Sequence, residues 1–140
     1  MTVTEERKDL FTVGEEYYLA HCIAADLRMG AGIAVPICQK FSVRTRIRAS
    51  GESLDYPTCI LTPPVFSLIT KKISSAKPTY GALGEALLKM KAIALEKDIR
   101  KIAMPKIGCG LDRLQWGVVK PMIESVFEDT DVEILVCLWK

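Results

Sequence analysis

Residues 104–116 read MPKIGCGLDRLQW, and this stretch indicates how the chain is organised. It begins at the end of residues 101–104, which we expect to form a short buried strand. It precedes residues 118–127, where apolar residues recur at helical spacing. Between the two, Gly108 and Gly110 give up side-chain packing and cost backbone entropy on folding. A tight turn, or a ligand lying directly against the main chain, would offset that loss.

The same alternation continues in both directions from this stretch. It predicts strands at residues 17–23, 58–62, 65–70, 101–104 and 132–138. It also predicts a helix at residues 33–41, a second helix that Thr79 caps after Pro78, and a third at residues 118–127. Residues 42–57 are polar and rich in arginine, and Arg44, Arg46 and Arg48 are interpreted as a solvated helix face. Strands alternating with helices predict one α/β domain over residues 1–140, with helices on both faces of a largely parallel sheet.

Composition limits the classes of function. The chain has 140 residues, 49% of them hydrophobic, and its 19 basic and 17 acidic residues give a net charge of +2, so bulk attraction to nucleic acid is not expected. Five cysteines without a C-x-x-C pair and a single histidine argue against structural zinc and favour free thiols in a reducing compartment. The charged N-terminus is not a secretory signal, and no apolar run has membrane-spanning length. We expect a soluble, intracellular monomer that needs no metal or cofactor.

Two glycine-containing loops, residues 30–33 and 107–111, each precede a predicted helix. Neither matches the G-x-G-x-x-G fingerprint or a P-loop, so nucleotide binding by those mechanisms is unsupported. Two interpretations fit: either each loop is an ordinary turn, or the two loops together offer backbone N–H groups that hold a diphosphate. The residues alone leave both interpretations open.

Four polar or glycine-rich segments lie at predicted strand ends, where ligands of parallel sheets bind: Asp9, residues 29–33, Lys71 and residues 107–112. Asp112 and Gln115 form a capping-box pattern, which would make Asp112 the N-cap of a helix that begins at residue 113. Such a helix would contain Pro121 in its interior, where proline is unfavourable, so we expect Asp112 to lie in the loop before the helix. Lys71 and Lys72 point to opposite faces of their strand, and only one of them can share a pocket with the glycine loops.

Asp9 and His21 can each be explained by a structural role. Asp9 begins a turn, or it accepts a hydrogen bond from an exocyclic amine such as that of adenine. His21 lies in an apolar strand and is interpreted first as a core histidine with its hydrogen bonds satisfied.

Three long motifs make the pattern specific: AHCIAADLRMGAGIA at residues 20–34, LITKKISSAKPTY at 68–80, and MPKIGCGLDRLQW followed by V-x-x-M-I-E-x-V-F. They resemble the macrodomain branch that contains terminal ADP-ribose protein glycohydrolase, also known as an O-acetyl-ADP-ribose deacetylase. The resemblance runs from Lys8 to about Leu138. It implies a three-layer α/β/α sandwich around a mixed, largely parallel sheet, with ADP-ribose bound in a cleft at one edge.

The resemblance also implies roles for residues. Lys71 matches the catalytic lysine, whose amine attacks the anomeric carbon of the distal ribose, and Asp112 matches the aspartate that shuttles protons and helps to resolve the lysyl adduct. Asp9 and Leu10 would hold adenine, and the two glycine loops would wrap the diphosphate and distal ribose. The full set of expected ADP-ribose-binding residues is Asp9, Leu10, His21, Met29, Gly30, Ala31, Gly32, Ile33, Thr70, Ile107, Gly108, Cys109, Gly110 and Leu111.

Two departures from other macrodomains stand out. Lys8 stands where the family commonly has glycine before the first aspartate, at the entry to the expected adenine pocket. The sequence contains no asparagine, so the asparagine-dependent mechanism of other macrodomain hydrolases cannot operate, which favours the lysine–aspartate assignment.

The resemblance leaves three functions open. The first is hydrolysis of ADP-ribose esters, either on glutamate or aspartate side chains of proteins or in O-acetyl-ADP-ribose. The second is a reader that binds ADP-ribose without catalysis, since the same cleft serves binding macrodomains. The third is hydrolysis of ADP-ribosylated DNA bases.

Overall fold

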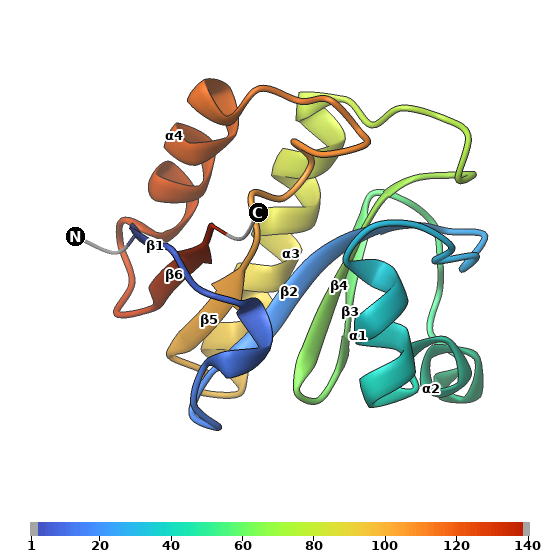
Figure 1. The fold of residues 1–140 in the computed structure, drawn as a ribbon, viewed down its shortest axis with the longest axis horizontal. Helices are drawn as coiled ribbons and strands as arrows, with labels where there is room; N and C mark the ends of the chain where they lie inside the picture. The colour runs from blue at the N-terminus through green and yellow to red at the C-terminus, as the bar shows by residue number, and fades with distance from the viewer. Residues whose placement is uncertain (1–2, 139–140) are drawn as a thin grey trace.

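The computed structural model describes residues 3–138, and its centre is a six-stranded sheet (Figure 1). The strand order is β1-β6-β5-β2-β4-β3, and every neighbouring pair is parallel except β3 and β4. The predicted mixed, largely parallel sheet is therefore confirmed. The strands are β1 Val3–Glu6, β2 Tyr18–Ala24, β3 Thr58–Thr62, β4 Val65–Lys71, β5 Lys101–Met104 and β6 Glu133–Cys137.

Helices cover both faces of the sheet. The helices are α1 Ala34–Phe41, α2 Val43–Ser50, α3 Tyr80–Glu96 and α4 Trp116–Phe127, and a single 3-10 turn, η1, spans Leu10–Thr12. Buried residues of α3 and α4 share one hydrophobic cluster, and those of α1, α2 and η1 share the other. This arrangement is the three-layer α/β/α sandwich that the resemblance implies.

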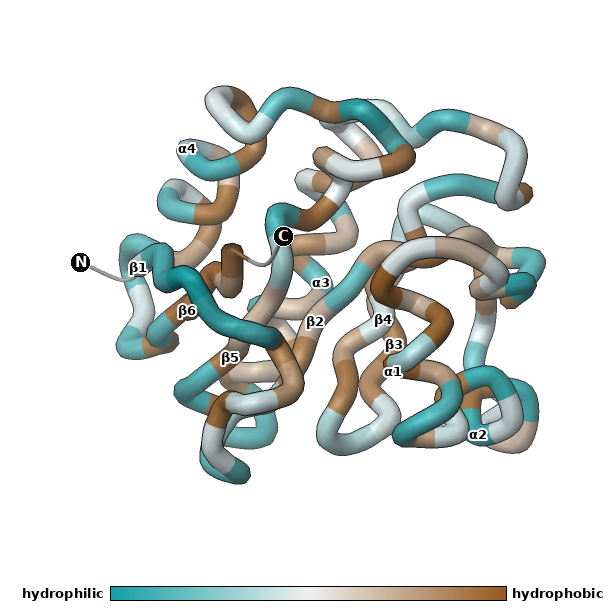
Figure 2. Tube along the Cα trace, viewed as in Figure 1, coloured by the Kyte–Doolittle hydropathy of each residue, from teal (hydrophilic) through white to brown (hydrophobic). Residues whose placement is uncertain are grey.

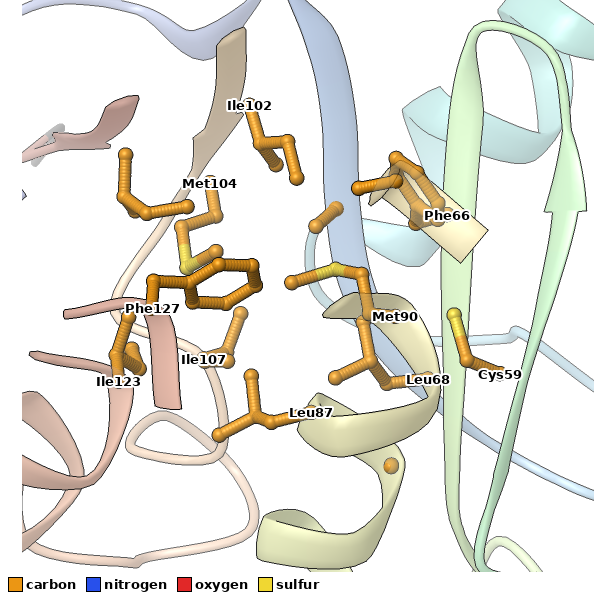
Figure 3. Packing of buried hydrophobic residues seen from close by; sticks show 14 of the residues in the cluster. Cys59, Phe66, Leu68, Leu87, Met90, Ile102, Met104, Ile107, Ile123 and Phe127 are labelled. Carbon is orange, nitrogen blue, oxygen red and sulfur yellow. The ribbon is translucent and has the colours of Figure 1, made fainter. Parts of the chain in front are cut away.

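Strand β4 shows why the sheet must lie in the middle layer. Its first six residues are all buried, as expected for a strand that is covered on both faces. Because side chains alternate along a strand, Phe66 and Leu68 join the cluster under α3 and α4, whereas Val65 and Ile69 join the cluster under α1 and α2. Figure 3 shows the first cluster, with Leu87 and Met90 of α3 lying near Phe127 of α4.

The sequence did not predict β1, although this strand pairs in parallel with β6. Val3 is the only buried residue of β1, and the next three positions are exposed. Figure 2 shows the hydrophilic run that continues from β1. Pairing with β6, rather than an apolar period, places these residues in the sheet.

Helix α2 partly corrects the interpretation of the arginine-rich segment. Val43 and Ile47, four residues apart, are buried on one side of the helix. Arg44 is not a freely solvated side chain, because its Nε donates to the Leu27 carbonyl at 2.7 Å and its Nη2 donates to the Arg28 carbonyl. Arg44 therefore fixes the loop that follows β2.

The parallel strands β2, β4 and β5 place their following loops together. All three strands run in the same direction with β2 in the centre, so their carboxyl ends meet at one edge of the sheet. These loops comprise residues 25–33, 72–79 and 105–115, which contain the motifs singled out in the sequence. The fold thus converts three separated motifs into one region.

Candidate functional site

A cleft of about 550 Å³ opens at the carboxyl ends of β2, β4 and β5. Most of its wall comes from the last residues of β2, from the loop that carries Met29 to Ile33, and from residues 105–108 and 110–112. Lys71, at the end of β4, completes the wall together with Ser74 and Lys77 from the loop that follows β4. The cleft is therefore where the strand-end rule predicts a ligand site.

Lys71 and Asp112 meet inside this cleft. The Lys71 Nζ lies 2.6 Å from Asp112 Oδ1, and the two side chains are 13% and 15% exposed. The same Nζ donates to the Ser74 carbonyl at 3.1 Å. Lys72 is exposed and does not line the cleft, so strand alternation selects Lys71 as predicted. A primary amine and a carboxylate are thus in contact in a space that admits a ligand.

Asp112 is not a helix cap. Helix α4 begins at Trp116, and its N-cap residue, Gln115, makes no side-chain capping hydrogen bond. Pro121 nevertheless lies inside α4, so the expectation that a proline would be excluded from the helix interior is wrong, although the helix does begin after Asp112. The prediction that Asp112 lies in the loop before the helix is confirmed, and its carboxylate is available to Lys71.

The two glycines of this loop serve different purposes. Gly108 has a φ of +73°, and a Cβ added to it would lie 2.9 Å from Leu114 Cδ1 and 3.6 Å from Leu83 Cδ2. Its small size is thus needed for a left-handed backbone and for packing on the core, which favours the tight-turn interpretation at this glycine. A Cβ on Gly110 would have nothing within 4 Å, so the space there is open toward the cleft.

The charge of the cleft differs from that of the whole chain. Among residues 3–138, four cationic side chains line the cleft, against one carboxylate, that of Asp112. The cations are Arg28, Lys71, Lys77 and Lys106. The Lys77 Nζ also donates to the Leu111 carbonyl at 2.9 Å, which ties two of the three loops together. A cationic cleft on a chain with net charge +2 favours a small anionic ligand over a long polyanion.

A second, smaller cavity adjoins the cleft. It measures about 340 Å³ and is lined by Asp9, Leu10, Cys137 and Leu138, together with Ile33, Pro105 and Lys106, which also line the cleft. The two cavities therefore meet at three shared residues. Asp9 already uses one carboxylate oxygen, because Oδ1 accepts from the Phe11 backbone N–H at 3.0 Å as the N-cap of η1.

Three residues expected to bind ADP-ribose lie in neither cavity: His21, Thr70 and Cys109. His21 is fully buried, its Nε2 lies 2.8 Å from Ser67 Oγ, and burial lowers its pKa to about 4, so the ring is neutral. Thr70 is 1% exposed, and Cys109 packs against the core cluster under α3 and α4. His21 is a core histidine, as interpreted, but its hydrogen bonds are not all satisfied, because its buried Nδ1 has no hydrogen-bond partner within residues 3–138. Its inclusion among the binding residues is not supported.

Several lining residues were missed in the sequence. Arg28, Lys77 and Lys106 lie within or beside the quoted motifs, but an exposed cation in a loop carries no signal of its own. Cys22 also lines the cleft, and burial together with the nearby Asp112 carboxylate raises the pKa of its thiol. Cys22 is therefore a neutral part of the wall.

Other expectations concern metals, disulfides and membranes. All five cysteines are free. Within residues 3–138, no three His, Cys, Asp or Glu side chains come together as a metal site would need. No helix in that same range is both long and apolar enough to cross a bilayer.

Known structures define the class of fold. The macrodomain of Thermus aquaticus DarG superposes with a TM-score of 0.82 at 23% identity, covering 96% of this chain and 97% of that chain. Thermosipho africanus DarTG, solved in complex with ADP-ribose, superposes with a TM-score of 0.77 at 18% identity, covering 98% of this chain and 41% of that chain. A scan of protein-family models finds no match. The fold is that of a macrodomain.

A sequence relative gives the branch within that class. The human protein named ADP-ribose glycohydrolase OARD1 is 44% identical over 141 residues, which cover 96% of this chain and 90% of the relative. The chain therefore belongs to the ADP-ribose glycohydrolase family of macrodomains.

Proposed function

We propose that this protein hydrolyses ADP-ribose esters, with Lys71 as the nucleophile and Asp112 as the proton shuttle. The observation that carries the proposal is the 2.6 Å contact between the Lys71 amine and the Asp112 carboxylate inside the cleft. The name of the human relative, ADP-ribose glycohydrolase, and the ADP-ribose complex of the Thermosipho africanus protein support the choice of ligand.

The two adjoining cavities suit the parts of an ADP-ribose molecule. Adenine would occupy the smaller cavity, where Asp9 offers a carboxylate to its exocyclic amine. The diphosphate would cross the shared boundary near Lys106 and lie along the glycine loops, whose cationic neighbours offset its charge. The distal ribose would then reach Lys71. Of the expected binding residues, eleven remain in this assignment: Asp9, Leu10, Met29, Gly30, Ala31, Gly32, Ile33, Ile107, Gly108, Gly110 and Leu111.

The chemistry begins from the ammonium–carboxylate pair. When the substrate excludes water from the cleft, Lys71 passes one proton to Asp112 and becomes a neutral amine. The amine forms a C–N bond to the anomeric carbon of the distal ribose, and the ester C–O bond breaks with its electron pair on the departing carboxylate. Asp112 gives its proton to that leaving group.

Hydrolysis of the adduct restores the pair. The Asp112 carboxylate takes a proton from a water molecule, whose oxygen bonds to the same carbon. The C–N bond breaks, its electron pair returns to the lysine nitrogen, and Asp112 returns the proton to it. ADP-ribose and the free carboxylic acid leave, and each bond formed is matched by one broken.

The test measures release of ADP-ribose by the purified protein from a glutamate-ADP-ribosylated peptide and from O-acetyl-ADP-ribose. Lys71→Ala and Asp112→Ala should each abolish release, whereas Lys72→Ala, which removes a neighbouring lysine outside the cleft, should retain it. Full turnover in both of the first two variants would exclude the mechanism.

Two controls separate the other functions. A parallel assay with an oligonucleotide that carries an ADP-ribosylated base measures whether the substrate is DNA. Tight ADP-ribose binding in calorimetry, without turnover of any of the three substrates, would identify a non-catalytic reader instead.

A further inference from the structure

Asp26 is connected to the Lys71 amine through Ser74, which lies in the loop that follows β4. Asp26, two residues beyond the end of β2, does not line the cleft. Its carboxylate Oδ2 accepts from the Ser74 backbone N–H at 2.7 Å, and its Oδ1 accepts from the Ser74 hydroxyl at 2.8 Å. One carboxylate therefore binds both donors of a single residue that is 48 positions away in the sequence.

Asp26 is itself held in place. Its Oδ1 also accepts from the Arg28 backbone N–H at 3.1 Å. Partial burial opposes ionisation, but the hydrogen bonds from Arg28 and Ser74 prevail and lower the pKa of Asp26 below its ordinary value. The backbone beside it is fixed too, since the Ala25 N–H donates to the Lys71 carbonyl at 2.9 Å. Asp26 is thus an ionised acceptor joined to the ends of both strands.

Ser74 connects this anchor to the amine. Its carbonyl accepts from Lys71 Nζ at 3.1 Å, while Asp112 Oδ1 accepts from the same nitrogen at 2.6 Å. The Ser74 carbonyl is the second of two fixed acceptors for the Lys71 amine. Without Asp26, the loop that carries this carbonyl would lose the two hydrogen bonds that set its position.

We propose that Asp26 is a positioning residue for Lys71, because it fixes the Ser74 carbonyl as the second acceptor of the reactive amine. The proposal rests on the function proposed above. After Lys71 gives a proton to Asp112, the lone pair on the nitrogen points toward Asp112 and must turn toward the sugar. Inversion at the nitrogen brings about that turn while one N–H stays bonded to the Ser74 carbonyl, so the nitrogen stays in place.

The kinetic test compares Asp26→Ala with Asp55→Ala, which removes an exposed aspartate from the loop before β3. Misplacement of a reacting group by about 1 Å lowers rates by up to about a hundredfold, so we expect kcat of Asp26→Ala to fall about ten- to hundredfold. KM and the calorimetric Kd for ADP-ribose should stay within about twofold, because Asp26 does not line the cleft. Asp26→Asn, which keeps one acceptor oxygen, should fall between Asp26→Ala and the wild type. Asp55→Ala should match the wild type.

A second readout does not depend on turnover. In a nitrogen-15 NMR spectrum that detects lysine side-chain N–H groups, Lys71 held by two acceptors should give a resolved signal that Lys71→Ala removes. Asp26→Ala should broaden or lose this signal, whereas Asp55→Ala should keep it. This result would stand even if Lys71→Ala retained turnover, so failure of the proposed function and failure of the positioning role are distinguishable.

Two results would overturn the proposal. One is an Asp26→Ala variant with the wild-type Lys71 signal and wild-type kcat. The other is a parallel loss of melting temperature, ADP-ribose affinity and kcat with the Lys71 signal unchanged, which would mean that Asp26 only stabilises the loop.

Discussion

Substitution of the two loop glycines separates backbone geometry from ligand contact. Gly108→Ala puts a methyl group on a residue with a φ of +73° and 2.9 Å from Leu114 Cδ1. The left-handed conformation costs an L-residue about 1–2 kcal/mol, and displacement of the Leu114 side chain adds to this. We therefore expect the free energy of unfolding to fall by about 1–3 kcal/mol. Gly110→Ala meets open space and should change it by less than about 0.5 kcal/mol.

Urea unfolding of the wild type and the two variants measures this difference, read from the midpoints at a common m-value. Calorimetry with ADP-ribose supplies the second comparison. Gly110→Val should weaken binding while leaving stability near that of the wild type, because Gly110 lines the cleft and lies free of the core. Equal stability of Gly108→Ala and Gly110→Ala would refute the assignment of Gly108 to packing and left-handed backbone.

Three further outcomes follow from other parts of the chain. Burial lowers the pKa of His21 from 6.5 to about 4, so its contribution to the free energy of unfolding is complete above pH 6.5 and is lost as the pH falls toward 4. Between pH 7 and pH 5, the free energy of unfolding should therefore fall by about 2 kcal/mol more in the wild type than in His21→Gln, as measured by urea unfolding. Thr79→Ala removes the acceptor for the Ala82 N–H at the start of α3 and should lower the free energy of unfolding by about 1 kcal/mol in the same assay. Lys106→Gln should weaken ADP-ribose binding about two- to fivefold and reduce its dependence on salt, as measured by calorimetry at two ionic strengths.

The sequence predicted the elements whose patterns are strong. The β4 prediction succeeded because both faces of the strand are buried, and the α3 prediction because Thr79 caps a helix with a regular apolar face. Strand β1 escaped prediction because three of its four residues are exposed, so that only its pairing with β6 defines it. Local patterns identify an element that buries its own side chains, but not one that is held by a neighbour.

The candidate site divides in the same way. Lys71 and Asp112 could be predicted because they stand inside long motifs, and their contact required only that β4 and the loop after β5 end at the same edge of the sheet. Asp26 stands inside a motif too, but its partner is the backbone and hydroxyl of Ser74 in a different loop. A contact of that kind depends on three-dimensional loop geometry, and no spacing in the sequence reports it.

The most direct test is to look for the covalent intermediate. Asp112→Ala incubated for a long time with an ADP-ribose ester should accumulate protein that is heavier by one ADP-ribosyl group. Lys71 that has lost its proton to solvent still attacks slowly, because a carboxylate can leave without being protonated, whereas the variant lacks the carboxylate that activates water for the second step. Peptide mapping by mass spectrometry should place the added group on residue 71, and an Asp112→Ala protein that also carries Lys71→Ala should show none. Turnover by Asp112→Ala at the wild-type rate, or an adduct on any other lysine, would contradict an attacking amine at position 71.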